Sequence, residues 1–169
     1  SVCVADVAKP EDRARLATLF PNVSVLVNNA GIQIYKPIED STPQEIEHEI
    51  AVNLTAPILL AHHFLPTLKR HPEAAIINVT SGLALIPKQA TGIYCATKAG
   101  LHSASKSLRW QLDDTVVRVF EVLPPFVATA MTTHRGQGGL QPDQLADEFW
   151  RGYTRNHFEM LIGLTKVLR

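Results

Sequence analysis

Short, mostly apolar segments alternate with amphipathic helical patterns along the whole chain. This alternation constrains the fold more than any other feature of the sequence. The strand-like segments are SVCVADV, VSVLVNN, AAIINV and VVRVFEVL. Strands that are apolar on both sides belong in a parallel sheet covered by helices on both faces. The sequence therefore predicts an α/β fold with a mostly parallel sheet, in which ligands bind beyond the carboxyl ends of the strands.

The composition excludes several classes of protein. Sixteen Lys and Arg residues balance sixteen Asp and Glu residues, so no net field attracts nucleic acid or an anionic membrane. Cys3 and Cys95 form neither a CxxC pair nor a multi-disulfide framework. The apolar runs APILLA and AAIINV are far shorter than the roughly 18 residues that cross a bilayer. We expect a single cytoplasmic domain over residues 1–169 that acts on a small molecule.

A predicted helix over residues 42–69 contains an unusual interruption. Thr42 is placed to act as the N-cap residue of a capping box, and the helical pattern continues to about Lys69. Inside this pattern, Pro57 follows Asn53 by four residues and has no N–H to donate to the Asn53 carbonyl. We expect the helix to bend there and the carbonyl to bind a water molecule. A simple proline kink is the alternative.

Ser81, Tyr94 and Lys98 together indicate proton transfer. Tyr94 and Lys98, at i and i+4, share one face at the N-terminal end of a predicted helix. A nearby ammonium lowers the pKa of a phenol from about 10 by roughly 1–3 pH units, which allows proton exchange near neutral pH. Ser81, at the end of the preceding strand, could hydrogen-bond a reacting carbonyl oxygen. In the alternative interpretation, Tyr94 packs, Lys98 is solvated and Ser81 begins a turn.

Other small or polar residues follow predicted strands at the same edge of the sheet. NNAG places Asn29, Ala30 and Gly31 where a flat ligand could approach the backbone, although the tetrapeptide alone is also typical of a turn. Asp6 either caps the next helix or binds a polar edge of a ligand. The stretch HRGQGG lacks the GK[ST] ending of a phosphate loop and suits a mobile flap over a substrate.

The histidines do not suggest a metal site. His62 and His63 are adjacent and point in different directions around a helix, which is poor geometry for zinc. The other five show no ligand spacing, and we expect them at the surface: His48, His71, His102, His134 and His157.

Taken in order, ADV, NNAG, the asparagine of VNLTAP, the S…Y…K series and PPFVAT resemble the short-chain dehydrogenase/reductase family over essentially the whole chain. SGLALIP, YCATKAGLHSASKSLRWQL and LPPFVAT look most like the branch labelled as involved in D-alanine esterification. The resemblance implies a Rossmann-type, doubly wound parallel sheet. It also implies an oxidoreductase that uses NAD or NADP and transfers a hydride between the nicotinamide and a carbonyl or alcohol substrate.

The resemblance also implies a role for each matching residue. Tyr94 would be the general acid/base, Lys98 would hold the nicotinamide ribose and tune Tyr94, Ser81 would orient the substrate, and Asn53 would support a proton relay. No metal is implied, and the long helices suggest a homodimer or homotetramer. The implied cofactor-binding residues are Asp6, Val7, Asn29, Ala30, Gly31, Tyr94, Lys98, Val127 and Thr129.

Two departures from the family pattern stand out. Pro124-Pro125 replaces the usual Pro-Gly, which removes an N–H and access to positive φ. The glycine-rich TGxxxGxG turn that holds the cofactor pyrophosphate has no counterpart, so we expect the first βαβ segment to be absent from this chain. Two rival interpretations follow: a non-catalytic binding or scaffold protein with this fold, and an epimerase or dehydratase of the same family.

Overall fold

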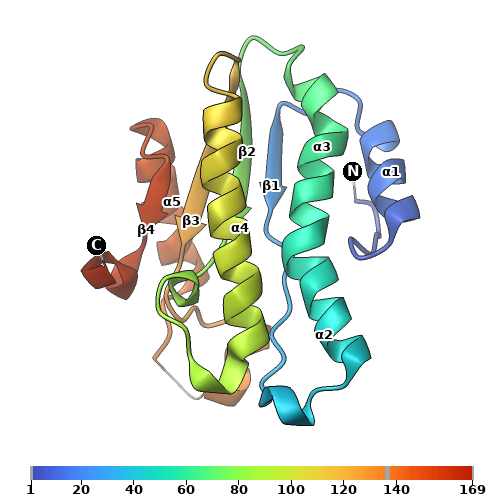
Figure 1. Ribbon diagram of the computed structural model, residues 1–169. Coiled ribbons are helices and arrows are strands. Elements are labelled where there is room, and N and C mark those ends of the chain that lie inside the picture. Colours follow the sequence, from blue (N-terminus) through green and yellow to red (C-terminus); the bar gives the residue numbers. More distant parts are fainter. Residues whose placement is uncertain (1, 136–137, 169) are drawn as a thin grey trace.

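The sheet of the computed structural model, which describes residues 2–135 and 138–168, has four strands that all run parallel (Figure 1). Their order across the sheet is their order along the chain. The predicted mostly parallel sheet is therefore confirmed. The strands are β1 (Val25–Asn28), β2 (Ala74–Val79), β3 (Val117–Leu123) and β4 (Glu159–Leu161).

Helices cover both faces of this sheet, as expected for a doubly wound fold. Figure 1 shows α3 and α4 side by side over one face, with α5 behind β3 and β4 on the other. The helices are α1 (Pro10–Leu19), α2 (Pro43–Ile50), α3 (Ala56–Leu68), α4 (Gly92–Gln111) and α5 (Pro142–Thr154). Short 3-10 turns lie at η1 (Ile38–Asp40), η3 (Gly82–Ala84), η4 (Gln89–Thr91), η5 (Ala130–Arg135) and η6 (Gly163–Leu168).

Two apolar clusters hold the layers together, one on each side of the sheet. Successive strand residues point to opposite faces, so Ile76 joins the cluster under α3 and α4 while Ile77 joins the cluster under α5. In β3, Val119 and Phe120 divide in the same way. The sheet centre is thus buried on both faces, as its continuous apolar sequence predicts.

The helix predicted over residues 42–69 forms, but in two pieces. The capping box is confirmed: the Thr42 hydroxyl accepts from the Glu45 N–H, and the Glu45 carboxylate accepts from the Thr42 N–H. A π-helical turn, η2 (Ala51–Thr55), then separates α2 from α3. Such π-turns occur frequently at functional sites, and this one contains Asn53.

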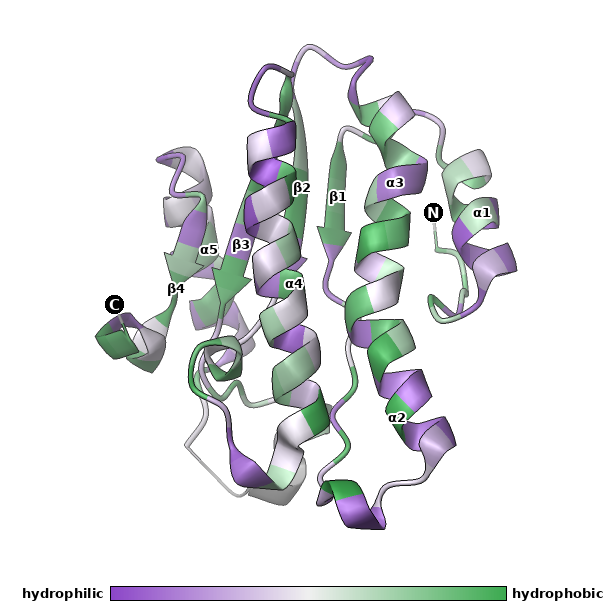
Figure 2. Cartoon of the chain, in the orientation of Figure 1, coloured by the Kyte–Doolittle hydropathy of each residue, from purple (hydrophilic) through white to green (hydrophobic). Residues whose placement is uncertain are grey.

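The run Pro43–Leu68 is long and apolar enough, by length and composition, to cross a membrane. The short apolar runs of the sequence did not predict this. Leu60, Phe64 and Leu68 of the run are buried in the cluster that α3 forms against the sheet. Figure 2 shows the same apolar character in the strands that α3 covers. Core packing therefore accounts for part of the hydropathy of this run, of whose apolar window 39% is buried.

The segment SVCVADV was predicted as a strand, and this prediction is wrong for residues 2–7. They form no strand, and Val2 and Val4 are 98% and 90% exposed. A strand needs a neighbour for its backbone hydrogen bonds, and none lies beside these residues in the part of the chain that the structure describes. The Val7 carbonyl instead accepts a hydrogen bond from Arg13 of α1.

The C-terminal part of the chain contains a strand and a 3-10 turn: β4 adds to the sheet beside β3, and η6 begins at Gly163, whose φ is +56°. Positive φ is readily adopted by glycine, and this residue turns the chain back toward the carboxyl edge of the sheet.

Candidate active site

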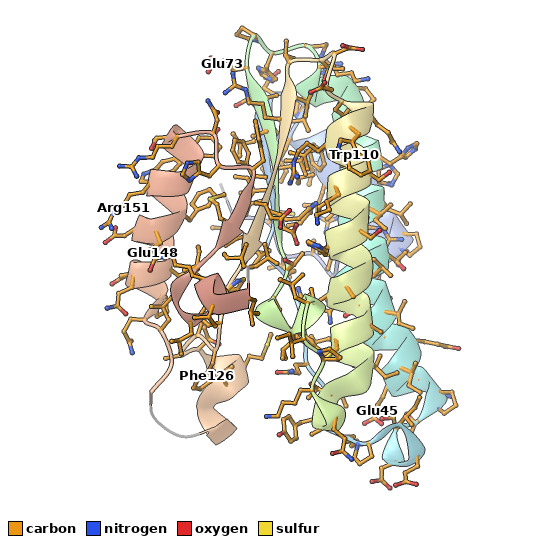
Figure 3. All side chains as sticks on the ribbon, turned by 60° about the vertical axis from the view of Figure 1, so that its left-hand side comes forward. Glu45, Glu73, Trp110, Phe126, Glu148 and Arg151 are labelled. Carbon is orange, nitrogen blue, oxygen red and sulfur yellow. The ribbon has the colours of Figure 1, made fainter. Side chains whose placement is uncertain are left out.

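The carboxyl ends of β1, β2 and β3 meet along one edge of the sheet. Their register pairs Asn28 with Asn78 and Val79 with Val122, so the segments that follow leave the sheet side by side. With the N-terminal half of α4 they surround a cavity of about 760 Å³, a volume typical of small-molecule sites. Figure 3 shows Phe126, another lining residue, on the loop after β3 at the end of the molecule where α4 begins.

Most of the predicted site residues line this one cavity. Those that line it are Ser81, Tyr94, Lys98, Asn29, Ala30, Gly31, Val127 and Thr129. Asn53, Asp6 and Val7 do not. The fold thus brings together residues that are up to a hundred positions apart in the sequence, as the strand-end pattern predicted.

Lys98 is buried beneath Tyr94. Its side chain is on the cavity side of α4, its Nζ lies 5.7 Å from the centroid of the Tyr94 ring, and only 4% of the residue is exposed. The ammonium donates a hydrogen bond of 2.8 Å to the Val79 carbonyl at the end of β2. Burial lowers the pKa of Lys98 to about 8. The lysine is thereby fixed at the sheet edge and aimed at the tyrosine.

Ser81 is held in a turn that leaves β2. Its Oγ accepts a hydrogen bond of 3.1 Å from the Leu83 N–H and caps η3, so the hydroxyl proton can be donated elsewhere. The Gly82 N–H donates to the Pro124 carbonyl at 2.9 Å. A Cβ on Gly82 would lie 2.6 Å from Thr165, which explains why glycine follows the serine. The turn ties the ends of β2 and β3 together.

Asn53 links three segments from the π-turn between α2 and α3. It is fully buried, exchanges two hydrogen bonds with the backbone of Ile32 and donates a third to Thr97 of α4. A Cβ on Gly31 would lie 3.3 Å from the Asn53 Oδ1 and 3.5 Å from the Lys98 Nζ. A small residue is therefore needed at position 31, where the chain passes close to the Asn53 Oδ1 and the Lys98 Nζ.

Asp6 and Val7 lie away from the cavity. The Asp6 carboxylate accepts from the Ala8 N–H, while the Asp6 N–H donates to Asp12 of α1. Val7 packs on the edge of the apolar cluster under α3. Both residues lie in the turn before α1, but the N-cap residue is Lys9 and no side chain caps the helix, so the structure does not bear out the capping alternative for Asp6.

The loop after β3 is organised by a threonine that sequence patterns did not identify. Thr132 donates a 2.6 Å hydrogen bond to the Val127 carbonyl and accepts one of 2.9 Å from the Thr129 N–H. Leu140 then pairs with this loop through the N–H of Ala128. The predicted flap HRGQGG includes residues 136 and 137, which lie outside the described part of the chain.

Sequence reasoning also missed a buried polar group close to the site. His102, predicted at the surface, is largely buried and lies 2.9 Å from the carboxylate of Glu121, which is fully buried in β3. Thr80, the residue before Ser81, donates to the same carboxylate. The signal that could have revealed this group is helical spacing, because His102 lies one turn beyond Lys98 on the same face.

Architecture and site together define the class of this protein as a Rossmann-type α/β protein with a serine, a tyrosine and a lysine at the carboxyl edge of its sheet. The chain belongs to the short chain dehydrogenase family, whose model matches residues 2–138. The resemblance recognised in the sequence is thus confirmed.

Relatives of known sequence support this assignment. The chain is 49% identical over 137 residues to "Uncharacterized oxidoreductase DltE" of Bacillus subtilis, an alignment that covers 79% of the chain and 54% of that protein. It is 30% identical over 131 residues to D-beta-hydroxybutyrate dehydrogenase of Rhizobium meliloti, covering 75% and 51%. The chain thus spans about half the length of these curated relatives.

Solved structures share the fold. A short chain dehydrogenase from Burkholderia cenocepacia in complex with NADP superposes with a TM-score of 0.89 at 25% identity, over 96% of this chain and 69% of that one. A short-chain dehydrogenase from Sphingobium yanoikuyae in complex with NADPH gives a TM-score of 0.84 at 27% identity, over 92% and 65%.

Proposed function

We propose that this protein transfers a hydride between a nicotinamide cofactor, NAD or NADP, and a carbonyl or alcohol carbon. The observation that carries the proposal is the placement of Ser81, Tyr94 and Lys98 around one cavity, with the lysine buried under the tyrosine ring. Membership of the short chain dehydrogenase family and relatives solved with NADP and NADPH support the same conclusion.

The residues present fit such a cofactor. Asn29, Ala30 and Gly31 line the cavity, and a Cβ on Gly31 would lie 3.3 Å from the Asn53 Oδ1, a tight contact. We propose that these residues, with Lys98, Val127 and Thr129, hold the nicotinamide end, and that Asp6 and Val7 border the adenine. When bound, the nicotinamide supplies or accepts the hydride.

The proton is moved by the protein's own residues. In this proposal the Tyr94 hydroxyl gives a proton to the carbonyl oxygen during reduction and takes it back during oxidation. Lys98, still largely protonated near neutral pH with its pKa of about 8, favours the phenolate by its charge. Ser81 donates a hydrogen bond to the same oxygen and orients it.

Asn53 is a positioning residue in this scheme. It does not line the cavity, but it ties the backbone at Ile32 to α4 one residue before Lys98. Pro57 has no N–H for the Asn53 carbonyl, and we propose that a water there passes protons between Lys98 and solvent.

We also propose that residues 1–169 make up most of one short-chain dehydrogenase domain, that it acts in the cytoplasm, and that it assembles as a homodimer or homotetramer through α3 and α4. Trp110, labelled in Figure 3, is 75% exposed on α4, and Ile58 is 44% exposed on α3. Replacing Trp110 by Asp should lower the oligomeric mass measured by light scattering. An unchanged mass would exclude this face as the interface.

The experiment that tests the function is a titration of the protein with NADH and NADPH, followed by an assay of cofactor oxidation with a panel of ketones and aldehydes. Oxidation that depends on the carbonyl compound supports the proposal. Binding without turnover would favour a scaffold protein, and product formation without net cofactor consumption would favour an epimerase or dehydratase.

A further inference from the structure

A column of polar side chains runs down the face of α4 that meets the sheet. Its members are four residues apart: Tyr94, Lys98, His102 and Lys106. Below the tyrosine, each meets a polar group of a strand or strand end. Lys98 binds the Val79 carbonyl, His102 binds Glu121, and the Lys106 Nζ lies 3.5 Å from the Glu159 carboxylate.

The middle pair of this column is the most buried. The side chain of Glu121 is fully buried and that of His102 is 14% exposed, and the His102 Nδ1 lies 2.9 Å from both carboxylate oxygens. The Thr80 hydroxyl donates to the Glu121 Oε1 at 2.6 Å. Burial raises the pKa of Glu121, which the hydrogen bonds from Thr80 and His102 oppose.

An ionisable residue inside a central strand is costly to bury, and an apolar side chain of similar size often stabilises such a position better. Stability alone therefore does not explain a glutamate at position 121. Its partners suggest another reason. Thr80 is the residue directly before Ser81, whereas His102 is two turns beyond Tyr94 on α4. The carboxylate therefore joins the strand end that carries the serine to the helix that carries the tyrosine.

We propose that Thr80, Glu121 and His102 form a positioning network that holds the Ser81 hydroxyl in register with the Tyr94 hydroxyl. This inference rests on the proposed function, because it assigns the network to the orientation of the reacting oxygen. None of the three is a catalytic residue. They act through Ser81, whose turn is also held by the Leu83 N–H on the Ser81 Oγ and by the Gly82 N–H on Pro124.

The first test removes only the Thr80 hydroxyl. Thr80→Val keeps the shape of the side chain, and Thr80→Ser keeps the hydroxyl. We expect Thr80→Val to lower kcat about tenfold to a hundredfold, the scale of a displaced reacting group, with the KM for the nicotinamide cofactor nearly unchanged and with Thr80→Ser close to the unmodified protein. Equal kcat values for the two variants would overturn the proposal.

Lys106→Gln is the matched control, because Lys106 lies in the same column one turn further from Ser81 and has its own carboxylate partner. We expect its kcat to stay unchanged. A loss as large as that of Thr80→Val would show that any change along α4 lowers turnover, and would overturn a specific role for the network. Glu121→Gln, which retains an oxygen for Thr80, should keep more activity than Glu121→Ala.

The second test needs no turnover, so it separates this inference from the proposed function. Hydrogen exchange of the Gly82 and Leu83 amides reports on the Ser81 turn, since both are hydrogen-bonded within it or to Pro124. We expect Thr80→Val to speed their exchange about tenfold through local opening, and Lys106→Gln to leave it unchanged. Unchanged exchange in Thr80→Val would refute the positioning role even in a protein without hydride-transfer activity.

Discussion

The two sides of the molecule differ sharply in how deeply their residues are buried. Around β2, β3 and α4, polar residues are buried and hydrogen-bonded: Asn53 is 0%, Lys98 4% and Ser81 8% exposed. At β1 and the N-terminal segment, apolar residues face outward: Val2 is 98% and Val27 53% exposed. The cavity lined by Ser81, Tyr94 and Lys98 therefore lies on the buried side. The side of β1 and the N-terminal segment leaves apolar side chains exposed in the described residues.

In the proposed function, proton transfer and cofactor binding therefore depend on different parts of the molecule. Ser81 follows β2, and Tyr94 and Lys98 lie on α4, so the residues proposed for proton transfer come from one strand end and one helix. Asp6 and Val7, proposed to border the adenine, lie on the exposed side. Variants on the two sides should therefore differ in the size and kind of their effects.

The largest effect is expected from Tyr94→Phe, on the buried side. The ring is retained, so the cavity keeps its shape, but the proton donor is lost. Turnover should fall at least about a hundredfold, the usual scale of a lost acid–base group, while cofactor binding stays nearly intact. Steady-state assays and a cofactor titration measure the two quantities. Comparable turnover in the variant would show that Tyr94 is not the acid/base.

Lys98→Met should change how stability depends on pH. In the folded protein the pKa of Lys98 is lowered to about 8 from its ordinary value of 10.5 by burial, so the unfolded state binds the proton more tightly. The free energy of unfolding should therefore rise with pH from about 8 to 10.5, by up to about 3 kcal/mol, and this gain should be missing in Lys98→Met.

Urea unfolding measured at pH 7 to 10.5 tests this expectation. The signal is the difference between the two pH profiles, because the variant also loses the hydrogen bond to the Val79 carbonyl at every pH. Parallel profiles would mean that Lys98 is not buried as an ionisable group.

Gly31→Ala should have a moderate effect, because the added methyl group would lie 3.3 Å from the buried Asn53 Oδ1, which must shift to accommodate it. Crowding of this kind costs about 1–3 kcal/mol of unfolding free energy. Gly92→Ala at the start of α4 is the control, since a Cβ there meets nothing within 4 Å and the φ of −59° suits any residue. Denaturant unfolding of both variants measures the difference between their losses of unfolding free energy. Equal losses would show that position 31 has room for a methyl group.

The smallest effect is expected from Val27→Thr on the exposed face of β1, below about 0.5 kcal/mol of unfolding free energy. The same exchange at Val119, which is 1% exposed in β3, should cost about 1–3 kcal/mol because it buries a hydroxyl in the core. A large loss at Val27 would show that this face is covered in solution, and would remove the contrast between the two sides.

Much of the fold was predictable from local patterns. The capping box at Thr42 and the apolar runs of β2 and β3 were recognised because they depend on residues close in the sequence. The strand prediction for residues 2–7 was wrong because it also relied on a local pattern. That pattern suits a strand, but a strand also needs a neighbouring strand for its backbone hydrogen bonds. The π-turn at Asn53 appeared in the sequence only as a bend at Pro57.

The residues of the candidate site likewise fall into those with a local sequence signal and those without one. Ser81, Tyr94 and Lys98 could be found because strand ends and i, i+4 spacing are local signals. Helical spacing beyond Lys98 could have placed His102 on the face of its helix that meets the sheet, but the pairing of His102 with Glu121 and the Thr132 hydrogen bonds could not be predicted, since each depends on which residue of another element lies opposite. A histidine in a helix and a glutamate in a strand carry no sign, in sequence alone, that they meet.

The sequence by itself determined the parallel α/β architecture and the residue types at the carboxyl edge of the sheet, because these follow from periodicity and chain direction. Only the tertiary structure decided that Lys98 is buried under Tyr94 and bound to the Val79 carbonyl, and that Thr80 shares a carboxylate with His102. The physical reason is that burial and hydrogen-bond partners across elements are set by packing, which no local pattern contains.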